Sequence, residues 1–171
     1  RVYPAVVESF SVYPGYTGTL RVRGMLSFVS EAGTNLLRMR GVLAGLEPST
    51  FGGWHVHAGF GCSQASGTPQ VAPGGHFFDG LATDPWTEVR WYTDSSGVAL
   101  IDATLSDFGG GPDATRSIAG RSVVVHDSAG ARIGCGLITP YANGQADVVH
   151  VTRYPGYTGG LNVHGMVHVR L

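Results

Sequence analysis

Four histidines in the first 126 residues are spaced in a way that suits a metal site. His55 and His57 flank a valine, His76 follows two glycines, and His126 ends the run SVVVH. Residues i and i+2 of a β-strand point to the same face with Cα atoms about 6.5–7 Å apart, so the first two imidazoles can reach one ion. Neutral imidazole suits copper and zinc. The HxH pair alone is weak evidence, because ordinary surface or core histidines also produce it.

The segments around these histidines resemble one known family. GWHVHAGFGC, GGHF, GRSVVVH and GARIGCGLI occur in this order, and together they closely resemble copper/zinc superoxide dismutase. The resemblance covers most of residues 1–141, including RGMLSF and RGVLAGLEP, which are similar to the family's second and third strands. It implies that His55, His57, His76 and His126 bind copper, with His76 at the position of the histidine that bridges copper and zinc.

The same resemblance assigns roles to three further residues. Cys62 and Cys135 match the family's intrasubunit disulfide, which implies either an oxidising compartment or a position protected from reduction. With the family resemblance, we expect an extracellular, secreted protein. The cysteine pair by itself permits a disulfide without proving it. Arg132 matches the arginine that guides and holds superoxide beside copper, and its planar cationic fork suits a small anion. The implied activity is superoxide dismutation, with Arg132 and His76 as the catalytic residues.

The sequence departs from the zinc-containing members of the family in two places. No histidine occurs between His76 and His126, and carboxylates with one imidazole make a poor structural zinc site. Only five residues separate His126 from Arg132, where the family has a long charged loop. Both departures resemble the copper-only branch of the family, so we predict one copper ion per domain and no zinc.

Without zinc, the ring of His76 needs another group to fix it and to share the proton of its second nitrogen. The copper-only branch uses a carboxylate from the strand after the zinc loop. By position we assign this role to Asp102, a polar residue in the apolar segment ALIDATL. Asp107 and Asp79 are the alternatives.

A six-residue motif, YPGYTG, begins at Tyr13 and again at Tyr154, and ten of the sixteen residues from these positions onward are identical. Their separation of 141 residues fits a tandem array of whole domains. We therefore interpret residues 1–141 as one copper-only dismutase-like domain and residues 142–171 as the first strands of a following repeat, free to pair with a sheet edge. This resembles the copper-only superoxide dismutase repeat proteins. The alternative is one domain closed by a duplicated hairpin.

Because the chain starts at Arg1 without Met, we interpret it as a processed or excised fragment.

Composition and alternation predict an all-β fold. Glycine accounts for 27 of 171 residues and charged residues for 13%, which is about half the usual charged fraction. Strands separated by Gly- and Pro-rich turns are predicted at residues 20–28, 36–46, 53–58, 98–105, 121–126 and 133–138. We expect an antiparallel Greek-key sandwich or barrel of about eight strands. The long stretch 60–96 is expected to be a functional loop.

Charge and hydropathy narrow the range of partners. The net charge is −1, so the chain offers no basic patch for nucleic acid. Apolar runs are shorter than the roughly 18 residues that a membrane span needs. Superoxide and neighbouring repeats are the expected partners. The alternative functions are a non-catalytic copper-binding, storage or extracellular scaffold domain, and a purely structural adhesive repeat.

Three histidines lie near the end of the chain. His164 and His168 alternate with Met166, a set that suits a second copper site. An exposed strand face explains the same pattern. His150 stands alone and is interpreted as structural.

Overall fold

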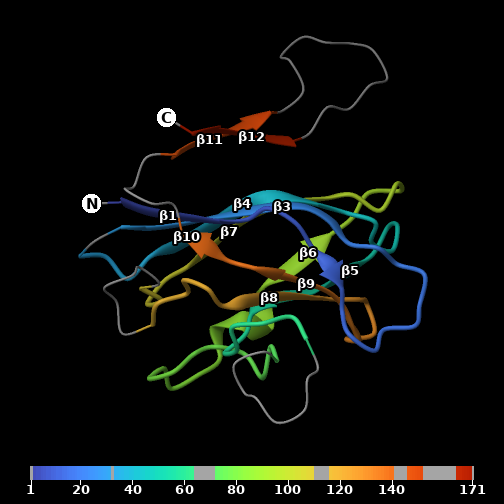
Figure 1. Ribbon diagram of the computed structural model, residues 1–171, viewed down its shortest axis with the longest axis horizontal. Helices are drawn as coiled ribbons and strands as arrows, with labels where there is room; N and C mark the ends of the chain where they lie inside the picture. Colours follow the sequence, from blue (N-terminus) through green and yellow to red (C-terminus); the bar gives the residue numbers. More distant parts are fainter. Residues whose placement is uncertain are drawn as a thin grey trace.

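The computed structural model describes residues 2–31, 33–63, 72–109, 116–140, 146–151 and 165–170, the last two ranges as backbone strands (Figure 1). A short 3-10 helix, η1, spans Pro85–Glu88. In the described ranges no helix is both long and apolar enough to cross a membrane. The strands, in chain order, are β1 (Val2–Val7), β2 (Ser11–Val12), β3 (Arg23–Glu31), β4 (Leu37–Ala44), β5 (Phe51–Val56), β6 (Arg90–Tyr92), β7 (Ala99–Leu105), β8 (Ser122–His126), β9 (Arg132–Leu137), β10 (Thr139–Pro140), β11 (Ala146–Val151) and β12 (Gly165–Arg170).

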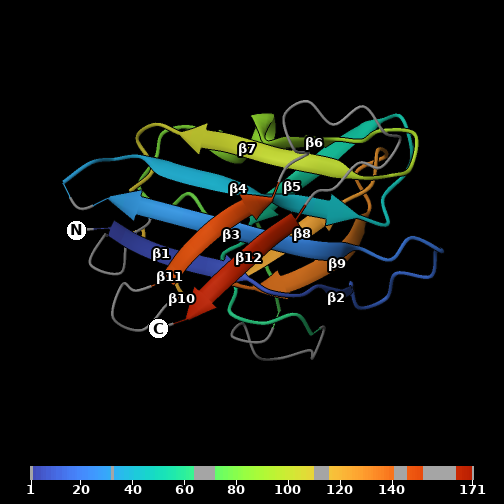
Figure 2. The same cartoon turned by 90° about the horizontal axis from the view of Figure 1, so that it is seen from above.

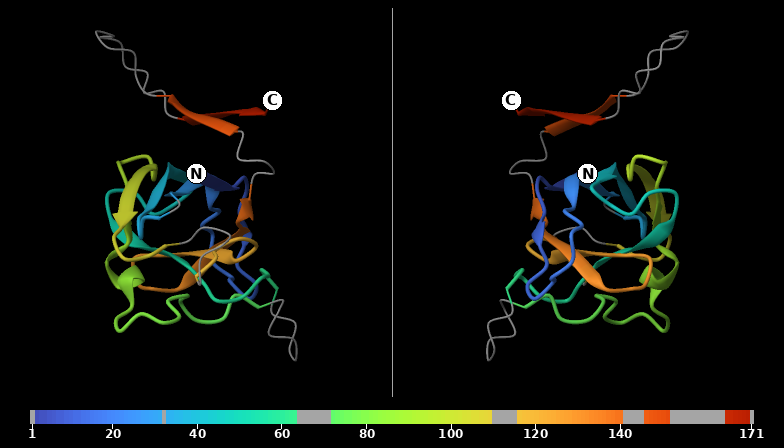
Figure 3. Two further views of the ribbon diagram at one scale, coloured as in Figure 1. Left: turned by 90° about the vertical axis from the view of Figure 1, so that its left-hand side faces the viewer. Right: turned by 90° about the vertical axis from the view of Figure 1, so that its right-hand side faces the viewer.

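Ten of these strands form two antiparallel sheets of five strands each. The first sheet has the order β10-β1-β3-β4-β7, and the second has the order β2-β9-β8-β5-β6. The sheets face one another as the two layers of a sandwich, which is clearest in the end views of Figure 3. This confirms the predicted all-β antiparallel fold. Strands β11 and β12 pair with each other as a separate hairpin, which lies on the outer side of the first sheet (Figure 2).

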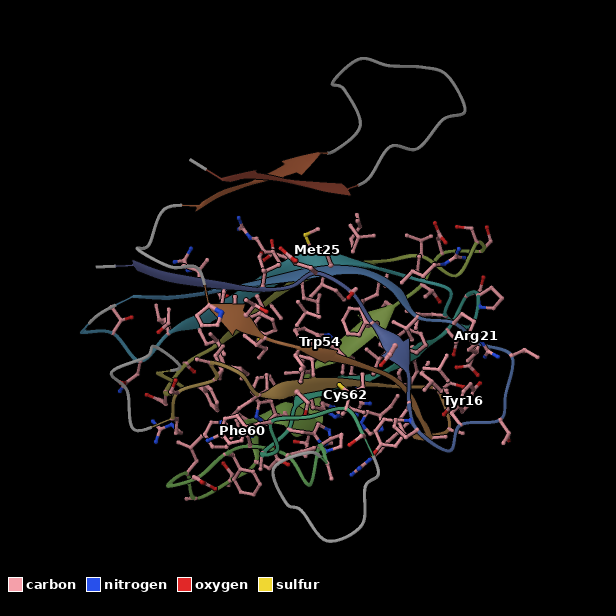
Figure 4. All side chains as sticks on the ribbon, in the orientation of Figure 1. Tyr16, Arg21, Met25, Trp54, Phe60 and Cys62 are labelled. Carbon is pink, nitrogen blue, oxygen red and sulfur yellow. A yellow bond between two sulfur atoms is a disulfide. The ribbon has the colours of Figure 1, made fainter. Side chains whose placement is uncertain are left out.

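Apolar side chains from both sheets fill the space between the two layers. In β4, Leu37 and Met39 are buried and alternate with exposed arginines, as a half-buried strand requires. From the second sheet, the fully buried Trp54 meets Phe28 edge to face, with ring centroids 6.3 Å apart. Figure 4 shows Trp54 between the sheets, whereas Met25 lies on the outer face of the first sheet. Burial of these large apolar groups is the main stabilising term of such a fold.

The six predicted strands are all present, with boundaries that differ by up to three residues. Strand β1 was not predicted, because Pro4 interrupts its apolar run and proline usually marks an edge strand or a non-strand. In the structure β1 lies between β10 and β3. Within the predicted loop 60–96, the described residues include η1 and the short strand β6.

The face of the second sheet that points away from the core is also covered. His55, Val124 and Cys135 are in register across β5, β8 and β9, so they share this face. Val124 and Cys135 are buried there together with Tyr13. A disulfide joins Cys62 to Cys135, with Cα atoms 5.7 Å apart, which confirms the predicted pairing. It fastens the segment after β5 to β9, and Figure 4 labels Cys62 at this position.

Candidate metal centre

Four histidines converge on the outer face of the second sheet. His55 lies in β5, His57 directly follows that strand, and His126 ends β8. His76 reaches them because its backbone forms an isolated antiparallel bridge with His57. One ring nitrogen from each histidine lies within 4.8 Å of the others. The structure thus brings together all four histidines predicted as ligands.

Backbone carbonyls fix the rings of two of these histidines. Nδ1 of His57 lies 2.9 Å from the carbonyl oxygen of Gly74, and Nδ1 of His126 lies 3.0 Å from that of Gly130. A carbonyl only accepts hydrogen bonds, so each Nδ1 carries the proton and donates it. The lone pair of each neutral ring is therefore on Nε2, which is free to bind an ion.

His55 presents its other nitrogen to the cluster. Its ring stacks over Gly53, where a Cβ atom would come within 2.6 Å of Cε1 and 2.7 Å of Nε2. Only a residue without a side chain leaves room for the ring at this position. The alternation of β5 predicted the direction of His55, but it did not predict this requirement for Gly53.

Buried ring nitrogens without hydrogen-bond partners test whether a metal fits the cluster. His55 Nδ1, His57 Nε2 and His126 Nε2 are buried and have no partner. An unsatisfied buried polar group costs about 1–3 kcal/mol of stability, so three of them in one place destabilise the fold unless a ligand binds them. They are the atoms that the tautomers and ring directions leave available for ligation. The residues therefore fit a metal ion bound by imidazole nitrogens.

The electrostatics of the cluster keep its histidine rings unprotonated. Burial, together with the neighbouring rings of His76 and His126, lowers the pKa of His55 to about 2. Burial likewise lowers the pKa of His57 to about 3, against the opposing effect of the Gly74 carbonyl. The pKa of His126 is lowered for the same main reason. These three rings are neutral at physiological pH, which is the form that binds metals.

The fourth histidine has a carboxylate partner, and it is a residue that the sequence analysis missed. Nδ1 of His76 donates to Oδ2 of Asp84 over 2.6 Å. The other carboxylate oxygen, Oδ1, accepts from the backbone N–H of Trp86 and caps η1. Asp84 is held in place by this cap, so it can fix the plane of the His76 ring. The available signal was Asp-Pro at residues 84–85, a pattern typical of a helix N-terminus.

The structure corrects the prediction that Asp102 orients His76. Asp102 lies in β7 and pairs with Arg40 of β4 at 3.3 Å, with 72% of its side chain exposed. Strand β7 belongs to the first sheet, whereas the cluster lies on the outer face of the second. The polar residue in an apolar strand is explained by alternation, because Asp102 points to solvent while Ile101 is buried. The alternatives Asp79 and Asp107 are not the partner either, since Asp84 occupies that position.

Arg132 lies beside the cluster, at the start of β9. Its Nη2 donates to the carbonyl oxygen of Gly74 at 3.0 Å, the same oxygen that accepts from His57. Its positive charge lowers the pKa values of both His57 and His126. The predicted anion-guiding residue is therefore within electrostatic reach of two of the histidines.

A tight turn connects His126 to Arg132. Oδ1 of Asp127 accepts from the backbone N–H groups of Ala129 and Ala131, and the Glu47 carboxylate accepts from the backbone and side chain of Ser128. These bonds hold the backbone that presents the Gly130 carbonyl to His126. The turn thus positions a ring of the cluster.

Among the described side chains, one group of three or more His, Cys, Asp or Glu residues could hold a metal ion, and it consists of these four histidines. The second copper site considered for His164 and His168, and the structural role given to His150, fall on side chains outside the described residues. In comparisons with known proteins, no family model and no curated protein matches the chain.

Proposed function

We propose that the four-histidine cluster binds one copper ion and that the domain is a copper-dependent superoxide dismutase working without zinc. The observation that carries the proposal is the convergence of unpartnered imidazole nitrogens beside Arg132. Divalent copper binds nitrogen sites more tightly than divalent zinc, which favours copper in an all-imidazole site. The resemblance of the histidine segments to superoxide dismutase supports the same assignment.

Copper, when bound, supplies one-electron redox chemistry, by which one superoxide is oxidised to dioxygen and a second, with two protons, is reduced to hydrogen peroxide. Arg132 would attract and hold the anion through its own positive charge. This attraction is local, because the chain's net charge of −1 does not draw anions to the protein as a whole. Its guanidinium presents a rigid, permanently charged fork that suits a small oxyanion.

His76 would transfer a proton during the reaction. Its Nδ1–H is committed to Asp84, so Nε2 is the atom that takes up or releases a proton. About a fifth of each of these two side chains is exposed, 23% for His76 and 21% for Asp84. Solvent therefore has access to this histidine, whereas His57 is completely buried.

The compartment and the wider organisation are also inferred. The disulfide supports secretion, because such bonds persist in oxidising environments. We infer a tandem array from the recurrence of YPGYTG. In this arrangement residues 142–171 begin a following dismutase-like repeat.

The proposal is tested by metal analysis and a dismutation assay on the full chain, with and without added copper. We expect one copper per chain and fast turnover, which Arg132→Ala lowers by about tenfold through loss of local attraction. Arg40→Ala is the matched control, because it removes an exposed arginine from the opposite sheet. Copper binding without turnover would favour a storage or scaffold domain. Stoichiometric zinc in the protein would contradict the zinc-free assignment.

A further inference from the structure

The side chain of Tyr13 reaches the anion-guiding arginine from the other end of the domain sequence. Its hydroxyl accepts a hydrogen bond from Nη1 of Arg132 at 2.8 Å, across 119 residues of chain. The two Nη atoms of Arg132 therefore have separate partners, Tyr13 on one side and the Gly74 carbonyl on the other. Two bonds to a planar fork fix both its position and its plane.

Tyr13 is itself held rigidly. Only 8% of the residue is exposed, and it packs with Val124 and Cys135 beside the disulfide. Its backbone N–H donates to the carbonyl of Ile133 at 3.1 Å, the residue that follows Arg132. The hydroxyl is thus anchored to the strand that carries the arginine.

The motif around Tyr13 explains how the chain places it. The N–H of Tyr16 donates to the carbonyl of Tyr13 at 3.0 Å, closing a turn with Pro14 and Gly15 at its centre. Gly15 has φ +84°, as the third residue of a type II turn requires, and proline suits the second. This is the YPGYTG motif, to which the proposed copper chemistry by itself gave no role.

We propose that Tyr13 is a positioning residue that holds the Arg132 guanidinium in the orientation that binds small anions at the metal centre. This inference rests on the proposed function. The bonds to Tyr13 and Gly74 use two of the five N–H donors of the guanidinium, and the others remain for the anion. Because the guanidinium is already ordered before the anion arrives, anion binding loses no free energy in ordering this side chain. The second copy of the motif, beginning at Tyr154, would give a following repeat the same device.

The test compares azide binding to the copper-loaded full chain in wild type, Tyr13→Phe and Tyr16→Phe, followed by optical absorption. Tyr13→Phe keeps the buried ring and removes the hydroxyl, so we expect azide affinity to fall by about three- to tenfold. Tyr16→Phe is the matched control: it removes a hydroxyl from the same motif that accepts from Leu20 rather than from Arg132. It should leave azide affinity within about twofold.

A double-mutant cycle separates positioning from a general structural effect. In an Arg132→Ala background, Tyr13→Phe should change azide affinity by less than about twofold, because the group that it positions is absent. Equal losses in the two backgrounds would overturn the proposal. So would wild-type affinity in Tyr13→Phe, provided that thermal melting shows the variant folded.

A measurement on the metal-free protein distinguishes failure of this inference from failure of the proposed function. Guanidinium ¹⁵N signals, assigned by their loss in Arg132→Ala, report rotation about the Cζ–Nη bonds of Arg132. We expect slow rotation in wild type and faster rotation in Tyr13→Phe. If copper does not bind, the proposed function fails, but the rotation rates still decide whether Tyr13 fixes Arg132. Identical rates in the two proteins would contradict the positioning role.

Discussion

Replacing Asp84 by asparagine tests the link between the His76 ring and the metal centre. The substitution removes the charge that faces Nδ1 of His76 at 2.6 Å and leaves one oxygen in place of two, because asparagine has an amide NH2 at the second position. Asparagine caps helices as well as aspartate does, so we expect its oxygen to keep the bond to the Trp86 N–H and its NH2 to face Nδ1 of His76. The change therefore removes the acceptor of His76 while the cap of η1 stays in place.

The expected loss follows from the charged hydrogen bond that His76 gives up. A bond to a charged group contributes about 1.5–3 kcal/mol, which corresponds to about 10- to 100-fold in affinity, because about 1.4 kcal/mol is tenfold. The same range is seen when the partner of a metal-binding histidine is changed. We expect Asp84→Asn to weaken copper binding by this amount.

The assay is a copper titration against a competing chelator, with Asp102→Asn as the matched control. Asp102 is a carboxylate in an exposed ion pair with Arg40 on the other sheet. Such pairs contribute about 0–1 kcal/mol to stability, and this one has no contact with the cluster. Its loss should leave copper affinity unchanged. Weaker binding in Asp102→Asn, together with wild-type binding in Asp84→Asn, would refute the reasoning.

Three further predictions concern the fold around the site. In the metal-free protein the unfolded chain binds protons that buried His55 and His57 exclude, because their folded pKa values are about 2 and about 3. These two histidines therefore leave the free energy of unfolding unchanged above about pH 6.5 and lower it as the pH falls from 6.5 toward 3. At pH 5 the two together should lower the free energy of unfolding, measured by urea titration, by about 4 kcal/mol. Reducing the disulfide, which spans 73 residues, should lower the free energy of unfolding by about 4 kcal/mol, measured by denaturant titration with and without reductant. Gly53→Ala should displace the His55 ring and weaken copper binding by about tenfold or more in the chelator titration. Gly75→Ala is the control and should bind copper normally, because an added Cβ meets nothing within 4 Å. Wild-type copper affinity in Gly53→Ala would contradict the argument from the His55 ring. A metal-free protein equally stable at pH 5 and pH 7, or a reduced protein as stable as the oxidised one, would contradict the other two arguments.

The fold class and most of the candidate ligands could be predicted from the sequence because they depend on local patterns. Alternation in segments such as β4 and β7 reports which residues face the core. The separation of two residues between His55 and His57 places both on one face of a strand. Resemblance of short segments to a known family then supplied His76 and His126, as well as the disulfide partners.

The partners of these side chains were decided by tertiary structure alone. Both Asp84 and Asp102 lie downstream of His76, and the sequence offers no measure of their distance from its ring. The choice depends on which sheet each residue joins and which face it occupies, and the structure places Asp102 on the wrong sheet.

The bond between Tyr13 and Arg132 shows the same limit more clearly. The two residues are 119 positions apart, and they meet because β2 pairs with β9 and brings the neighbouring turn onto the same edge. The sequence therefore determined which chemical groups are present and which lie on one face of a strand. The tertiary structure decided which groups touch, because pairing between distant strands is set by the packing of the whole domain.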